Sequence, residues 1–239
     1  MHAHLVAAPA PGPVLEPTEP QVTAATPGLP GAGVTVGVQA VADGQQVTFG
    51  APDRPGLFSR CAGVLALNQL DVRAASISVD DGWATSIFAV RPRFGRAPVP
   101  EILADGLRAA LDGTLQVADR LRQREVDYRE DGARSAAPRV SWHDAEVAGA
   151  ASTIVEVRAG DRAGLLYQLT TALADAGLDV TSARIETLGA DALDSFYVCD
   201  PGGEAMDPDR RRRLEVALAA AARGRPVDPV GPDAADTPG

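Results

Sequence analysis

The sequence contains no lysine, and all 22 of its basic residues are arginine. It holds three histidines and two tryptophans, and its net charge at pH 7 is −10. Nucleic-acid backbones and anionic membranes attract basic surfaces, so this charge argues against either as the main partner. Hydrolytic metal centres need several histidine and aspartate ligands on one site, and His2, His4 and His143 are too few to supply them. We therefore expect no catalytic and no metal-ligating residue on this chain.

No apolar run in the sequence is long enough to span a bilayer. The first residues lack the basic region and the full apolar region of a secretion signal. Cys61 and Cys199 lie in periodic apolar segments without C-x-x-C spacing, which predicts free buried thiols in a reducing compartment. Together these absences predict a cytoplasmic protein.

Proline and glycine concentrate outside the periodic segments. Residues 9–33 contain seven prolines and four glycines, and such a stretch cannot bury enough apolar surface to offset its ordering entropy. We expect a flexible Pro/Gly-rich leader over residues 1–44 and a disordered tail over residues 224–239. Residues 125–150 read as a polar connector, in which Arg139–His143 could form an edge strand.

An internal repeat decides the architecture. Shifting the chain by 108 residues aligns Val47–Val90 with Val155–Val198 without a gap, and 16 of the 44 positions are identical. Agreement of this length without a gap indicates a duplicated domain. We assign residues 45–124 to repeat 1 and residues 151–223 to repeat 2.

Both repeats predict the same elements from their apolar periodicity. Repeat 1 predicts a strand over 46–51, a helix from Leu57, a hairpin of strands over 70–79 and 83–90, a helix over 100–111 and a closing strand over 115–121. Repeat 2 predicts a strand over 153–158, a helix from Leu165, strands over 178–188 and 192–199 and a helix over 208–223.

The element order β-α-β-β-α-β predicts an α+β fold, with two ferredoxin-like domains in tandem and the helices on one face of an antiparallel sheet. After Ala222 only glycine, arginine, proline, valine and acidic or other small residues follow, so repeat 2 is expected to lack its own last strand. An open sheet edge must be covered. We expect Arg139–His143, or an element of repeat 1, to cover it and so to dock the two repeats on each other.

The motif that recurs in register is D-R-x-G-L, at Asp53–Leu57 and Asp161–Leu165. Its aspartate is a good helix N-cap, and Pro55 suits a first helical turn, where repeat 2 carries Ala163. Backbone N–H groups at a helix start form a positive pole that suits a carboxylate. The motif thus predicts a site for the carboxylate of a free amino acid, with the ammonium group held by carbonyls or acidic side chains. A capped helix start without a ligand explains the motif equally well.

The residues around the motif carry a family resemblance. D-R-P-G-L followed by L-x-x-x-x-L-D-V-x-x-A-x-I resembles the ACT domain, a family of small regulatory modules that bind amino acids. Repeat 2, with Ser-Ala-Arg-Ile from residue 182 and Asp-Ser-Phe-Tyr-Val from residue 194, is similar to the C-terminal ACT repeat of the bifunctional PII-protein uridylyltransferase/uridylyl-removing enzymes. The likeness covers about residues 45–223.

The resemblance implies that the paired repeats sense an amino acid, with glutamine expected, and regulate uridylylation in nitrogen signalling. It implies PII protein or catalytic nucleotidyltransferase and phosphohydrolase domains as partners. The parent enzymes would use a divalent metal and UTP, and no cofactor is expected on this chain. Carried over by position, the ligand-binding residues would be Asp53, Arg54, Gly56, Leu57, Asp71, Val72, Asp161, Arg162, Gly164, Leu165, Asp179 and Val180.

Two other functions stay open at this point. One is a stand-alone ACT-repeat protein that regulates another enzyme or a transcription regulator. The other is residual uridylyltransferase or phosphohydrolase activity, against which the missing metal-ligand carboxylates and histidines argue. His143-Asp144 reads as a chance dipeptide, and Arg210–Arg213 reads as a solvated helix face with local ion pairs.

Overall fold

The computed structural model describes residues 33–127, 137–147, 150–188, 190–200 and 206–224. Repeat 1 contains β1 (Thr35–Val41), β2 (Gly44–Pro52), α1 (Leu57–Leu67), β3 (Leu70–Asp80), β4 (Trp83–Pro92), α2 (Pro100–Leu111) and α3 (Val117–Asp127). Repeat 2 contains β5 (Arg139–Val147), β6 (Ala150–Gly160), α4 (Leu165–Asp175), β7 (Asp179–Leu188), β8 (Asp191–Cys199) and α5 (Pro208–Ala222).

The strands form one antiparallel sheet of eight strands in the order β1-β2-β4-β3-β7-β8-β6-β5. The order is symmetric about the β3–β7 pair, where Ala75 lies opposite Ala183, its own counterpart 108 residues on. Each repeat also has a bulge at the same place, between Val72 and Ala74 and between Val180 and Ser182. The two repeats are therefore related by a local twofold axis that passes between β3 and β7.

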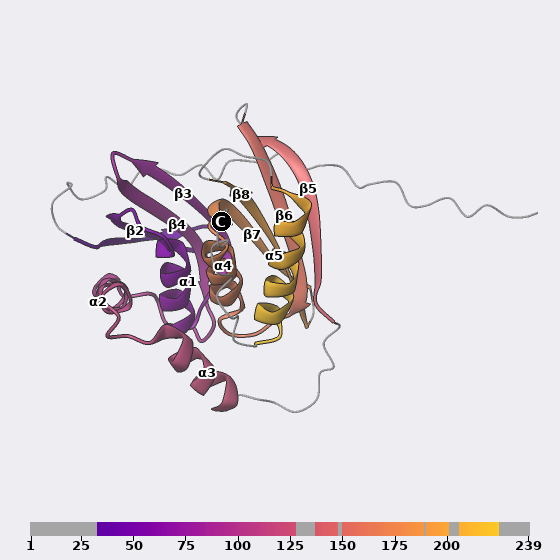
Figure 1. Cartoon of the computed structure of the whole chain (residues 1–239). Helices are drawn as coiled ribbons and strands as arrows, with labels where there is room; N and C mark the ends of the chain where they lie inside the picture. The colour runs from indigo at the N-terminus through magenta and orange to yellow at the C-terminus, as the bar shows by residue number, and fades with distance from the viewer. Residues whose placement is uncertain (1–32, 128–136, 148–149, 189, 201–205, 225–239) are drawn as a thin grey trace, which may run out of the picture.

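The helices gather on one face of the sheet (Figure 1). α2 packs on α1, α1 on α4 and α4 on α5, while α3 packs on α1. Strand residues alternate accordingly, and in β4 the buried side chains are Ala84, Ser86, Phe88 and Val90. The α+β fold with two ferredoxin-like units in tandem is confirmed. The helices cover one face because alternate residues of each strand form an apolar row on that face.

The fourth strand of each unit comes at the start of the repeat and not at its end. Two of our predictions for repeat 1 are therefore wrong: the leader does not extend to residue 44, because Thr35–Val41 is β1, and residues 115–121 form no closing strand. The edge beside β2 is already occupied by β1, which a two-residue turn joins to it. The segment from Val117 is free to form a helix, which buries Val117 and Leu121 against the core.

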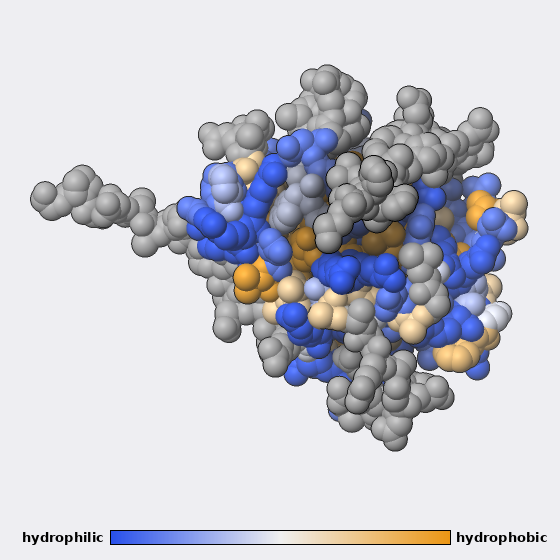
Figure 2. All heavy atoms as spheres, turned by 90° about the vertical axis from the view of Figure 1, so that its right-hand side faces the viewer, coloured by the Kyte–Doolittle hydropathy of each residue, from blue (hydrophilic) through white to orange (hydrophobic). Residues whose placement is uncertain are grey.

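In repeat 2 the expected edge strand is present. β5 pairs with β6 along its whole length, with Trp142 opposite Val155. From α5, Arg211 donates a hydrogen bond to Asp144 at 2.7 Å and lies over the Trp142 ring at 5.9 Å from its centre. Figure 2 views the side of the molecule that faces right in Figure 1, and hydrophilic side chains make up much of its coloured surface.

The prediction that this strand docks the two repeats is wrong, because β5 lies at the outer edge of the sheet. The repeats join instead through β3 with β7 and through α1 with α4. α1 and α4 can approach closely because Gly63 has no side chain; a Cβ there would lie 2.8 Å from the Tyr167 ring. The duplicated unit thus uses its own equivalent elements as the interface.

Candidate functional site

The D-R-x-G-L turns bend through their glycines. Gly56 and Gly164 are the N-caps of α1 and α4, with φ of 74° and 80°, a left-handed conformation that costs a side-chain-bearing residue energy. The expectation that Asp53 caps α1 is wrong, because neither helix has a side-chain cap. The backbone N–H groups of Asp53 and Asp161 instead donate to the hairpin loops ahead of β4 and β8, at 2.8 and 2.9 Å. Because the Asp53 and Asp161 carboxylates do not cap the helices, they are available for other contacts.

Two cavities lie at the interface between the repeats. The first, which we call the Asp194 pocket, has a volume of about 490 Å³ and lies between the turn of repeat 2 and the start of β3 in repeat 1. The second, the Ser86 pocket, has a volume of about 440 Å³ and lies between the turn of repeat 1 and the start of β7. Both volumes are in the range of small-molecule sites.

All twelve residues predicted from sequence line one of the two cavities. The Asp194 pocket is lined by Asp71, Val72, Asp161, Arg162, Gly164 and Leu165. The Ser86 pocket is lined by Asp53, Arg54, Gly56, Leu57, Asp179 and Val180. Each cavity thus joins a turn from one repeat to a strand start from the other.

The two cavities are copies of each other. Sixteen of the 19 residues that line the Asp194 pocket have their counterpart, 108 positions away, in the lining of the Ser86 pocket. The counterparts of the remaining three, Arg93, Phe94 and Arg124, lie outside the described residues. Differences at the shared positions therefore report how the two sites have diverged.

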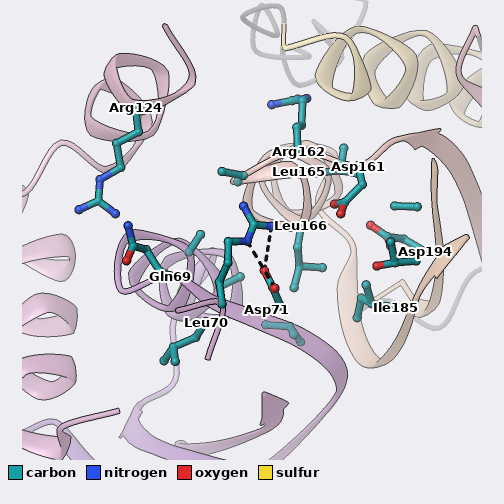
Figure 3. Close-up of a pocket in the computed structure, with 18 of the residues that line it drawn as sticks. Gln69, Leu70, Asp71, Arg124, Asp161, Arg162, Leu165, Leu166, Ile185 and Asp194 are labelled. Carbon is teal, nitrogen blue, oxygen red and sulfur yellow. Dashed lines mark hydrogen bonds and ion pairs between the residues drawn. The ribbon is translucent and has the colours of Figure 1, made fainter. Parts of the chain in front are cut away.

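One end of the Asp194 pocket carries an ion pair. Arg93 contacts Asp71 with nitrogen and oxygen 2.9 Å apart, and both side chains remain more than a third exposed. Next to them, Gln69 holds a positive φ of 58°, where repeat 2 has Gly177. Arg124 of α3 faces this end and donates to the Leu67 carbonyl (Figure 3). Two arginines, one of them paired with Asp71, thus lie at this end of the cavity.

Arg162 lines the cavity, but its guanidinium contacts other parts of the chain. Its guanidinium donates to the carbonyls of Ala221 and Ala222 at the end of α5, and to the side chain of Gln168. A cation at a helix C-terminus is favourable because the last carbonyls have no partners within the helix. Arg162 therefore ties the turn to α5 and shapes the pocket wall.

Sequence reasoning missed Asp194. This β8 residue is 1% exposed, lines the Asp194 pocket, and its Oδ1 atom has no hydrogen-bond partner among the described residues. Burial raises its pKa to about 7, with a smaller contribution from the negative charge of Asp161. In Figure 3 the two carboxylates face each other. The available signal was a charged residue in the buried row of β8, between Ala192 and Phe196.

The Ser86 pocket has a different charge pattern. Ser86 stands at the position of Asp194 and is equally buried. At its strand start, burial raises the pKa of Asp179, and the nearby Asp53 and Asp200 add smaller effects in the same direction. Cys199, expected to be a buried thiol, is only half-buried and lines this pocket, whereas Cys61 is fully buried in the core.

Comparison with protein families gives one match, in which residues 153–218 fit the ACT domain. The chain carries an ACT domain. The matched segment runs from β6 to α5 and includes the D-R-x-G-L turn of repeat 2. The ACT repeat therefore contributes the turn and the Asp194 strand of the first cavity.

The curated relatives are bifunctional uridylyltransferase/uridylyl-removing enzymes. The chain is 38% identical to the Streptomyces coelicolor enzyme, over 73% of this chain and 22% of the enzyme. Identity to the Mycobacterium tuberculosis enzyme is 39%, over 66% of this chain and 21% of the enzyme. The Rhodospirillum rubrum enzyme is 35% identical, over 80% of this chain and 21% of the enzyme. The chain thus spans about a fifth of the length of the relatives it matches.

Among solved structures, a protein of Galdieria sulphuraria described as unknown is 15% identical, with a TM-score of 0.25, over 74% of this chain and 90% of that one. In the described part of the ACT-containing chain, no three His, Cys, Asp or Glu side chains lie together as metal ligands would. No helix in the same residues has the length and apolarity to cross a membrane.

Proposed function

We propose that this chain is the amino-acid-sensing regulatory part of a bifunctional uridylyltransferase/uridylyl-removing enzyme, and that glutamine is its ligand. The observation that supports this most is the pair of cavities, each built from a helix-start turn of one repeat and a strand start of the other. The first-turn N–H groups of α4 have no acceptor within the helix and suit the ligand carboxylate. Arg124, which lines the same cavity, adds a positive charge for that group.

Placement at the interface makes binding regulatory. A ligand that contacts both repeats stabilises the arrangement of β3 against β7 in which those contacts exist. Attached catalytic domains would read this arrangement and shift between adding uridylyl groups to PII protein and removing them. We place this activity in the cytoplasm, where free amino acids report nitrogen supply.

Calorimetric titration of the purified full chain with a panel of amino acids tests the proposal. We expect saturable heat with glutamine at millimolar concentration, and at ten times Kd a gain in unfolding free energy of about 1.4 kcal/mol. Absence of both heat and thermal shift for every amino acid would contradict the proposal.

A matched pair of variants locates the site. Ala192 and Ala84 are counterparts, both buried, and each lines one cavity. Ala192→Val and Ala84→Val add the same two carbons, so each narrows one cavity at a comparable cost in stability. We expect at least one of them to weaken glutamine binding. Unchanged affinity in both would place the ligand outside the cavities.

The link between amino-acid binding by this chain and the transfer or removal of uridylyl groups needs a separate test. A neighbouring reading frame that encodes nucleotidyltransferase and phosphohydrolase domains would support the proposal. Amino-acid binding without such a partner would favour a stand-alone ACT-repeat regulator of another enzyme.

A further inference from the structure

The most unusual group in the described chain is the Asp194 carboxylate. It is 1% exposed, and its Oδ1 atom accepts no hydrogen bond from the described residues. Burying a carboxylate without a partner is costly, so such a group persists where it serves a purpose other than folding. The matching position in repeat 1 is Ser86, which lines its own cavity without a charge.

The charged groups around the cavity do not neutralise Asp194. The charged group that acts on it electrostatically is Asp161, on the turn before α4, which is also negative. The arginines that line the cavity, Arg93, Arg124 and Arg162, donate to Asp71, to the Leu67 carbonyl and to the end of α5 respectively. The Asp161–Asp194 side of the cavity therefore carries negative charge, while at the other end Asp71 offsets Arg93 and Arg124 adds a positive charge.

An α-amino acid is a zwitterion, with one positive ammonium group and one negative carboxylate group. We propose that Asp194, assisted by Asp161, binds the ammonium group of the ligand, so that the Asp194 pocket is the high-affinity site and the Ser86 pocket is not. The inference rests on the proposed function and deepens it, because it names the charged group recognised and the cavity that recognises it. Arg93 and Arg124 then lie toward the ligand carboxylate, away from Asp194.

This assignment links binding to pH. The free pocket holds Asp194 with a pKa of about 7, so the carboxylate is about half ionised at neutral pH. An ammonium group binds the ionised form and lowers its pKa, so binding releases a proton near pH 7. Affinity rises as pH increases from 6 to 8, because the ionised fraction goes from roughly a tenth to roughly nine-tenths. The expected gain over this range is about tenfold.

The test titrates the full chain with glutamine at pH 6, 7 and 8, and with its desamino analogue, which keeps the carboxylate and lacks the ammonium group. Wild type is expected to bind glutamine about tenfold more tightly at pH 8 than at pH 6, and to bind the analogue weakly at every pH. Repeating the calorimetric titration in two buffers of different ionisation enthalpy gives the number of protons released on binding, from the difference between the two observed heats.

Three variants complete the experiment. Asp194→Asn and Asp194→Ser are expected to lose at least tenfold in affinity at pH 8 and to bind independently of pH. Ser86→Ala, in the other cavity, is the matched control and is expected to retain wild-type affinity and pH dependence. Circular dichroism and thermal melts show that each variant is folded before it is titrated.

The outcomes separate this inference from the proposed function. The role of Asp194 is refuted if wild type binds glutamine with an affinity that does not depend on pH, or if Asp194→Asn binds glutamine as tightly as wild type. Either result leaves the proposed amino-acid sensing intact. Loss of binding in Ser86→Ala would show that the ligand occupies the Ser86 pocket, and would also refute the role of Asp194. If no amino acid binds, both proposals fail.

Discussion

Replacing Asp194 by asparagine should change how the stability of this protein depends on pH. The carboxyl group has a pKa of about 7 in the folded chain, against an ordinary value of 3.8, because it is buried beside Asp161. A pKa raised on folding means that the folded state binds the proton more tightly, so stability is fully present below pH 4 and declines as pH rises to 7. Asparagine has no proton to lose and removes this decline.

The magnitude follows from the size of the pKa difference. Each unit is worth 1.36 kcal/mol, so about three units correspond to about 4 kcal/mol between pH 4 and pH 8. Near pH 4 the variant should be about as stable as wild type, since a buried amide and a buried neutral carboxyl group without partners have similar costs. Near pH 8 it should be the more stable protein.

Chemical denaturation of the full chain at pH 4, 5, 6, 7 and 8 measures the difference in unfolding free energy at each pH. Asp105→Asn is the control, because Asp105 is exposed in α2 and its replacement should shift the curve without changing its slope. Parallel curves for wild type and Asp194→Asn would refute the reasoning, since they would mean that Asp194 ionises as easily in the folded chain as in the unfolded one.

The glycines of the two turns predict a second difference between the repeats. Gly164→Ala should cost more than Gly56→Ala, by about 1–2 kcal/mol in thermal or chemical denaturation, although both hold a positive φ. A Cβ at Gly164 would lie 2.9 Å from the buried Leu121 side chain, whereas at Gly56 it would meet only the flexible end of Arg60. Leu121→Ala alone should cost about 2–5 kcal/mol, because the side chain is 1% exposed. Combined with Gly164→Ala it should cost less than the sum of the two, and strict additivity would argue against the contact.

Some errors of sequence interpretation came from signals that were present. The segment from Thr35 to Val41 alternates, and Asp43 and Gly44 at its end are common near hairpin turns, yet the proline-rich composition before it hid the strand. For residues 115–121 a short apolar pattern did not distinguish strand from helix. These residues could not add a strand beside β2, because β1 already occupies that edge of the sheet, and the segment from Val117 forms a helix.

Asp194 marks a different kind of limit. Its place in the buried row of β8 was readable, since Phe196 and Val198 follow at period two. Whether an acidic side chain in such a row has a partner depends on residues from other elements. Asp161, the charged group that acts on it, is 33 positions away in sequence, and only the folded turn brings the two together.

The sequence by itself determined the duplication and most of the helices and strands, and the resemblance to the ACT domain supplied the twelve residues of the turns and strand starts. The duplication and the elements follow from local periodicity and from a 108-residue repeat, which can be read along the chain. The tertiary structure decided that each turn faces the strand start of the other repeat, and that one cavity holds a carboxylate whose Oδ1 atom has no partner among the described residues, where the other holds Ser86. Those features arise when β3 pairs with β7 across the local twofold axis, and pairing between distant strands is not encoded in any single stretch.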